Sequence, residues 1–108
     1  MTARSARILL VEDDEIQGEI LKSLLEQQQY IVEYCVDGRS AIAASEKKQF
    51  DLAFIDIYLP DISGLDVLDN LRASPRYANT PILMMTADAT EDTSVLALVK
   101  EADEVLIK

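Results

Sequence analysis

The sequence predicts an α/β fold in which a parallel sheet of five strands carries helices on both of its faces. Two observations lead to this class. Short, continuous apolar runs alternate along the chain with stretches in which apolar residues recur at helical spacing. Continuous apolar runs are typical of strands that are covered on both faces, as they are in parallel sheets. Strands that alternate with helices indicate βαβ units with right-handed crossovers.

The first part of the chain supplies two strands and the helix between them. Strands are expected at residues 7–11 and 30–36, where apolar side chains dominate. Between them, apolar residues return every three or four positions, which indicates a helix that begins at Ile16 and ends at the three glutamines 27–29. The apolar face of this helix consists of Ile16, Ile20, Leu21, Leu24 and Leu25.

The middle of the chain repeats this pattern. A turn signal at residues 37–38 precedes a short, Ala-rich helix that is expected to run to about Lys48. The apolar run that follows predicts a central strand at residues 52–57. A further helix is expected to start after Gly64 and to close near residues 74–75.

The last part of the chain begins with an expected loop at residues 75–81. A fourth strand follows at residues 82–85, and Pro81 can open it because the first residue of a strand need not donate to the ladder. A fourth helix is expected at residues 90–102, since a threonine and two acids stand at its start. A fifth strand is expected at residues 104–108.

This element order ends on a strand, which leaves one face of the sheet short of a helix. A fifth helix would cover the sheet beside the helix that begins at Ile16, so its absence predicts an exposed apolar strip there. We therefore expect residues 1–108 to be one domain that is incomplete at its C-terminal end and belongs to a longer protein. Such a strip predicts either a homodimer or a stability lower than that of a chain extended by one helix.

Composition excludes several classes of function. Ten basic residues stand against 20 acidic ones, and the formal net charge of −10 argues against nucleic acid binding by this domain itself. The chain has no histidine, which excludes histidine metal sites and a phosphohistidine of its own. The single Cys35 excludes an intrachain disulfide and is expected to be a small buried residue. No apolar run suits a signal peptide or a membrane span, so we expect a cytoplasmic location and no membrane contact.

Charged residues follow three of the predicted strands at the point where each strand ends. Asp56 follows the central apolar run, the acids 12–14 follow the first strand, and Lys108 follows the last. In an open parallel sheet, ligands bind in the crevice beyond the carboxyl ends of the strands. Alone, Asp56 would more often be a helix cap or a turn residue. The convergence of these charges on one edge of the sheet favours a functional site.

Four segments of the chain resemble the receiver domain of two-component response regulators, as in chemotaxis regulators. They are RILLVEDDE at residues 7–15, DLAFIDIYLPDISGLDVL at 51–68, TPILMMTA at 80–87 and ADEVLIK at 102–108. Each motif alone is weakly specific, but the four stand in the family's order and at fitting distances. The resemblance covers nearly the whole chain. It implies the strand order 2-1-3-4-5 of the flavodoxin-like, doubly wound, three-layer sandwich.

The resemblance also implies a role for individual residues. Asp56 corresponds to the aspartate that becomes phosphorylated, Thr86 to the hydroxyl that engages the phosphoryl group, and Lys108 to the lysine that pairs with it. The residues that would hold Mg²⁺ are Glu12, Asp13, Asp56 and, through its main-chain carbonyl, Tyr58. Because the acidic run extends to Asp14, the pair Asp13–Asp14 is an alternative to Glu12–Asp13.

These roles predict a phosphoacceptor receiver of a two-component phosphorelay. Asp56 would take a phosphoryl group, with the help of Mg²⁺, from a phosphohistidine of a sensor histidine kinase or phosphotransfer protein, or from a small phosphodonor. A change of conformation would then regulate an output partner that the sequence does not name. The domain would not be an enzyme in its own right, since it would catalyse only its own phosphorylation and dephosphorylation. Val105 stands where the family often has an aromatic residue, which puts the aromatic part of the switch in doubt.

Three other functions were weighed. A phosphohydrolase of the haloacid dehalogenase type would need a second aspartate two positions after Asp56, where this chain has Tyr58. A flavin carrier would need a phosphate-binding loop after the first strand, where the acids 12–14 would repel phosphate. A receiver-like module that binds partners without being phosphorylated remains the alternative.

Overall fold

The computed structural model describes residues 5–87 and 102–107 of the chain. In this part of the chain, five strands form a single sheet. The strands are β1 (Arg7–Val11), β2 (Ile31–Cys35), β3 (Leu52–Asp56), β4 (Ile82–Thr86) and β5 (Glu104–Ile107). Neighbouring strands all run parallel, in the order β2-β1-β3-β4-β5. The predicted fold class and strand order are therefore confirmed.

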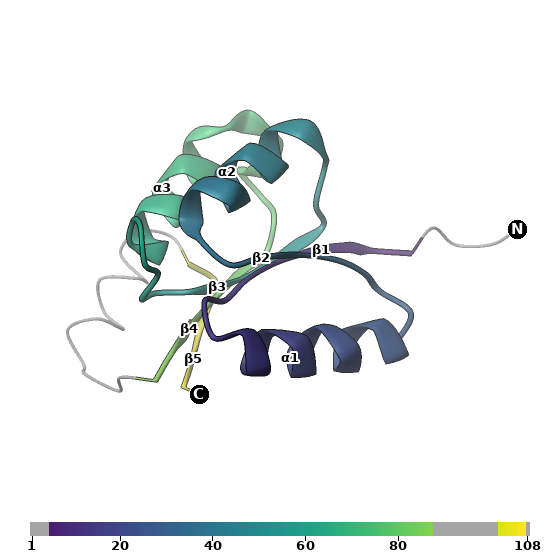
Figure 1. Cartoon of the computed structure of the whole chain (residues 1–108). Helices are drawn as coiled ribbons and strands as arrows, with labels where there is room; N and C mark the ends of the chain where they lie inside the picture. Colours follow the sequence, from purple (N-terminus) through teal and green to yellow (C-terminus); the bar gives the residue numbers. More distant parts are fainter. Residues whose placement is uncertain (1–4, 88–101, 108) are drawn as a thin grey trace, which may run out of the picture.

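Helices lie on both faces of this sheet. They are α1 (Glu15–Gln27), α2 (Gly38–Lys47) and α3 (Gly64–Ala73). Figure 1 shows α1 on one face of the sheet and α2 with α3 on the other, which gives the expected three layers. The helix predicted at residues 90–102 lies outside the described residues except for Ala102, which is 9% exposed. Lys108 also lies outside them.

Burial distinguishes the central strands from the edge strands. Residues 8–11 of β1 are at most 1% exposed, as expected for a strand that is covered on both faces. In the edge strand β2, only Cys35 is buried. The main core lies between the sheet and the pair α2–α3, where Val67, Leu68 and Leu71 of α3 pack against β1, β3 and β4. The predicted burial of Cys35 is confirmed, and this burial raises the pKa of its thiol to about 11.

Local polar contacts begin and end the helices. Asp37 caps α2 by accepting a hydrogen bond of 2.8 Å from the backbone N–H of Ser40. Ser63 and Asp66 form a capping box at the start of α3. After α1, Gln29 adopts a left-handed conformation with φ of 70°, a position where glycine is more common. This turn explains why β2 begins at Ile31 and not at the predicted residue 30.

The expected loop at residues 75–81 contains one turn of 3₁₀ helix, η1 (Pro75–Tyr77). The turn starts locally, since the Ser74 side chain accepts a hydrogen bond of 3.3 Å from the N–H of Arg76 and Pro75 stands at the first helical position, and a distant contact anchors its end. Tyr77 is 3% exposed, and its hydroxyl lies 2.8 and 2.7 Å from the carbonyl oxygens of Ser45 and Lys48 at the end of α2. The single hydroxyl proton is shared between these two acceptors, and the carbonyl of Ser45 is one of those that the end of a helix leaves without an intrahelical partner.

The predicted exposed apolar strip is present along α1. Ile16, Ile20 and Leu24 are 75%, 56% and 53% exposed, so three of the five residues of the apolar face are largely open to solvent. Ile107 at the end of β5 is 65% exposed. An apolar groove of about 220 Å³ runs beside this strip, lined by Glu12, Gln17, Ile20, Leu21, Leu24 and Met85.

Candidate functional site

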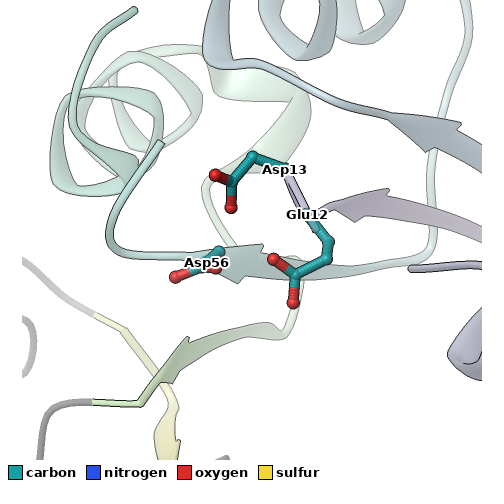
Figure 2. Close-up of side chains that lie close together, drawn as sticks. All are labelled: Glu12, Asp13 and Asp56. Atoms are coloured by element: carbon teal, nitrogen blue, oxygen red, sulfur yellow. The ribbon is translucent and has the colours of Figure 1, made fainter. Parts of the chain in front are cut away.

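Three carboxylates meet where β1 and β3 end. Asp56 is the last residue of β3, and Glu12 and Asp13 directly follow β1. The register pairs Val11 with Ile55, so Glu12 and Asp56 occupy corresponding positions on adjacent parallel strands. One carboxylate oxygen from each of the three acids lies within 4.8 Å of the others. Figure 2 shows their side chains gathered at this edge of the sheet.

The three acids differ in their exposure to solvent. Glu12 and Asp56 are each 3% exposed, whereas Asp13 is exposed. Buried carboxylates are rare unless a partner offsets the loss of water. Because one oxygen of each acid converges within 4.8 Å, a single cation could be bound from the open side, where Asp13 lies.

Backbone groups fix the direction of the two buried carboxylates. The N–H of Tyr58 donates to Oδ1 of Asp56 at 3.0 Å, and the N–H of Asp14 donates to Oε2 of Glu12 at 3.3 Å. Both bonds connect a side chain to the backbone two residues further on, and the bond at Asp56 has the pattern of an Asx turn. The carboxylates are thus oriented by the loops in which they stand.

Asp14 has a different task from its two neighbours in the acidic run. Its Oδ1 accepts hydrogen bonds from the N–H groups of Ile16 at 3.0 Å and Gln17 at 3.2 Å, which makes it the N-cap of α1. Its carboxylate is not in the group of three that converge. The geometry thus favours Glu12–Asp13 over the alternative pair Asp13–Asp14.

Thr86 lies on the next strand at the same edge of the sheet. It is the last residue of β4 and is fully buried. Asp56 pairs with Met85, and a backbone bond of 2.8 Å from the N–H of Ile57 to the carbonyl of Met85 continues the ladder past Asp56. Thr86 pairs in turn with Ile107, the residue before Lys108. The side chain of Tyr58 is half exposed, and its N–H is the group that contacts Asp56.

The loop after Asp56 is held against the start of α2. Gly38 and Arg39 donate backbone hydrogen bonds of 2.9 Å to the two carboxylate oxygens of Asp61. Desolvation alone would raise the pKa of Asp61, but the N–H groups of Gly38, Arg39 and Ile62 outweigh it and lower the pKa to about 2. These contacts could not be predicted from local pattern, because Gly38 and Arg39 stand more than 20 positions before Asp61.

Tyr34 makes a second long-range contact with this site that could not be predicted from the sequence. Its hydroxyl donates to the carbonyl oxygen of Glu12 at 2.8 Å, across 22 residues of sequence. Burial and the nearby carboxylates, Glu12 first, raise the pKa of Tyr34, so the hydroxyl keeps the proton that it donates. In the sequence, Tyr34 belongs to the apolar run that predicts a strand, and no local pattern distinguishes it from the other residues of that run.

Fold and site together define a class of protein. The sheet has the doubly wound order, and an acidic pocket stands beyond the carboxyl ends of its central strands, where such folds bind ligands. The sequence model of the family "Response regulator receiver domain" matches residues 8–108. The chain belongs to the receiver domain family of response regulators.

Among named relatives, the chain is 36% identical over 104 residues to the regulatory protein VanRB of Enterococcus faecalis. This match covers 96% of the chain and 46% of VanRB. The chain thus spans about half the length of the curated relatives that it matches.

Solved structures agree with this membership. The chemotaxis protein CheY4 of Vibrio cholerae superposes with a TM-score of 0.92 at 28% identity, covering 97% of this chain and 88% of CheY4. The receiver domain of the sensor histidine kinase PA1611 from Pseudomonas aeruginosa has a TM-score of 0.88 at 27% identity, with 97% and 86% covered. That structure carries a magnesium ion in its active site cleft. Among the described helices of the present chain, none has the length and apolar character needed to cross a membrane.

Proposed function

We propose that this domain accepts a phosphoryl group on Asp56 in a Mg²⁺-dependent transfer. The observation that carries the proposal is the convergence of Asp56 with Glu12 and Asp13 at the ends of two central strands. Membership of the receiver domain family and the magnesium ion of the PA1611 receiver domain support it. The domain catalyses its own phosphorylation and dephosphorylation and has no other substrate.

Asp56 acts as the nucleophile in this scheme. One of its carboxylate oxygens forms a bond to phosphorus while the bond from phosphorus to the nitrogen of the donor breaks, and the electron pair of that bond stays on the donor's imidazole. The hydrogen bond from the N–H of Tyr58 restrains the carboxylate before the donor arrives. This restraint reduces the conformational freedom that must be lost on the way to the transition state.

The donor set of the site fits Mg²⁺, which prefers oxygen ligands and is often held by one or two carboxylates. Glu12, Asp13 and Asp56 would hold the ion together with the main-chain carbonyl of Tyr58. When bound, Mg²⁺ supplies positive charge that offsets the repulsion between these carboxylates and the incoming phosphoryl group. Glu12 and Asp56 are already buried and oriented, so little side-chain freedom is lost when the ion binds.

Thr86 and Lys108 complete the proposed site. The hydroxyl of Thr86 donates to a phosphoryl oxygen, and the ammonium group of Lys108 pairs with another. A conformation that brings Thr86 closer to the phosphoryl group is favoured after phosphorylation, which shifts the population that the output partner meets. Val105 is partly buried against the core and pairs with Met84 of β4. Because valine has no aromatic ring, we assign this position no aromatic switch.

The donor in this proposal is a phosphohistidine of a sensor histidine kinase or phosphotransfer protein in the cytoplasm. Residues 1–108 contain no histidine, so the phosphoryl group must come from outside this domain. A small phosphodonor can replace the protein donor because the catalytic groups all belong to this domain. The output is carried by a partner or by a further domain, as suits a relative of a regulatory protein.

Intact-mass analysis after incubation with acetyl phosphate tests this function. The wild-type chain is expected to gain one hydroxylamine-labile phosphoryl group in the presence of Mg²⁺ and none when the ion is chelated. Asp56→Asn should abolish the adduct and keep the fold. The control Asp69→Asn changes an exposed aspartate of α3 in the same way and should be labelled normally.

Two outcomes would contradict the proposal. An adduct retained by Asp56→Asn would show that another group is the acceptor, Asp13 or Asp14 first. A wild-type chain that gains no phosphoryl group with Mg²⁺ would favour the alternative of a module that binds its partners without phosphorylation.

A further inference from the structure

Glu12, in the loop that carries the acidic pair, is hydrogen-bonded to β2 through both its backbone N–H and its backbone carbonyl. The N–H of Glu12 donates to the carbonyl of Cys35 at 3.0 Å. The carbonyl of Glu12 accepts the hydroxyl of Tyr34 at 2.8 Å, and the same hydroxyl lies 3.5 Å from the carbonyl of Asp14. The phenol of Tyr34 therefore stands against the two carbonyls that flank Asp13 in the sequence.

Helix α1 has a glycine, and therefore no side chain, at the position where this phenol packs. Gly18 is buried, and a Cβ atom added to it would lie 2.2 Å from both Cζ and Oη of Tyr34. No described glycine has a positive φ, so the backbone conformation of Gly18 does not require glycine. A glycine inside a helix is unfavourable compared with alanine. The absent side chain at this position is thus explained by the space that the tyrosine ring occupies.

We infer that Tyr34 is a positioning residue for the Mg²⁺ site. This inference rests on the proposed function. The carbonyl of Glu12 and the N–H of Asp13 belong to one planar peptide unit, so a bond that holds this carbonyl also fixes the plane from which Asp13 projects. Tyr34 would act through the peptide between Glu12 and Asp13 and not as a ligand of the ion.

Asp13 is the ligand that depends most on this restraint. Glu12 and Asp56 are buried and receive backbone hydrogen bonds on their carboxylates, whereas the side chain of Asp13 is exposed. Without the Tyr34 bond, the peptide before Asp13 would sample more orientations, and binding of the ion would have to select one of them. Groups that orient metal ligands in this way commonly change metal affinity when they are removed.

Tyr34→Phe tests the inference because it removes only the hydroxyl and leaves the ring against Gly18. The dissociation constant for Mg²⁺, measured by calorimetry, is expected to rise about fivefold, the equilibrium change that one neutral hydrogen bond produces. The Mg²⁺ concentration that gives half-maximal labelling by acetyl phosphate should rise by the same factor, with the labelling rate at saturating Mg²⁺ little affected. Tyr30→Phe, at an exposed tyrosine just before β2, is the matched control and should leave the Mg²⁺ affinity unchanged.

The outcomes separate the inference from the proposed function. If wild type binds Mg²⁺ and is labelled, but Tyr34→Phe binds the ion equally well, the positioning role is wrong. A variant that is only less stable to urea, with unchanged Mg²⁺ affinity of the folded chain, would likewise show a purely structural role. A wild-type chain that binds no Mg²⁺ would contradict the proposed function itself and the inference with it.

Discussion

Gly64, the first residue of α3, stands against the backbone of the proposed phosphoacceptor. A Cβ atom added to it would lie 2.0 Å from the carbonyl oxygen of Asp56, 2.8 Å from its carbonyl carbon and 2.9 Å from Cα of Ile57. All three atoms belong to the backbone and cannot rotate away. Real Cβ contacts are essentially never shorter than 3.0 Å, so Gly64→Ala must move the start of α3 or the end of β3 by about 1 Å.

Two opposing effects determine how far this displacement lowers the free energy of unfolding. Overpacking of a well-packed region destabilises by about 1–3 kcal/mol, and the rigid atoms met here place Gly64→Ala near the upper end. Alanine regains up to about 1 kcal/mol because it favours the helix over glycine. We therefore expect the free energy of unfolding to fall by about 2 kcal/mol. Because the moved atoms include the backbone of Asp56, labelling by acetyl phosphate should also slow.

Urea unfolding followed by circular dichroism measures the change, and Gly38→Ala is the matched control. Gly38 is the first residue of α2, and a Cβ atom there would meet Cγ1 of Ile62 at 2.5 Å, a side-chain atom that can rotate aside. This variant should lose less stability than Gly64→Ala and should keep its labelling rate. Equal stability of Gly64→Ala and wild type, or an equal loss in both variants, would refute the argument from backbone proximity.

Two further predictions concern the polar contacts around the core. The pKa of Asp61 is lowered to about 2 in the folded chain, below the ordinary value near 3.8, so its contribution to stability is complete above pH 4 and is lost as the pH falls towards 2. The stability difference between wild type and Asp61→Asn should therefore shrink from pH 4 to pH 2, and a constant difference in urea titrations would contradict this. Arg72 is 10% exposed, and its guanidinium donates to the carbonyls of Tyr77 and Thr80 and to Asp103 at 2.6–2.8 Å. Arg72→Met should cost about 2 kcal/mol, because buried carbonyls lose their donors. Arg39→Met removes a 79% exposed arginine that lies 3.8 Å from its partner and should cost less than about 0.5 kcal/mol; similar losses in the two variants would count against the reasoning.

The fold and the position of the site could be predicted because both depend on local pattern. The run 52–55 is continuous and apolar, which identified β3 as a central strand with Asp56 at its end. Alternation of strands and helices then required parallel neighbours, and parallel strands bring their carboxyl ends to one edge. Glu12 and Asp56 are close because β1 and β3 are also neighbours in the sheet, an order that the family resemblance implied and local pattern did not.

Other features could not be read from local pattern. The apolar spacing of α1 predicted a helix with one apolar face, and the element order predicted an exposed strip beside it, but neither showed that Ile16, Ile20 and Leu24 would be the largely exposed residues. The contact that anchors the turn of 3₁₀ helix at Pro75–Tyr77 depends on where the end of α2 lies. Both were decided by packing between distant elements.

The sequence by itself determined the order of the elements and the edge of the sheet at which the acids meet. The tertiary structure decided which groups hold that edge in place. The hydroxyl of Tyr34 reaches the carbonyl of Glu12, Asp61 accepts hydrogen bonds from the first N–H groups of α2, and Gly64 lets α3 approach the backbone of Asp56. These contacts join residues up to 23 positions apart. Their hydrogen bonds and close approaches require interatomic distances that are correct to within a few tenths of an ångström. Periodicity sets which face a residue occupies, but only the packed chain sets such distances.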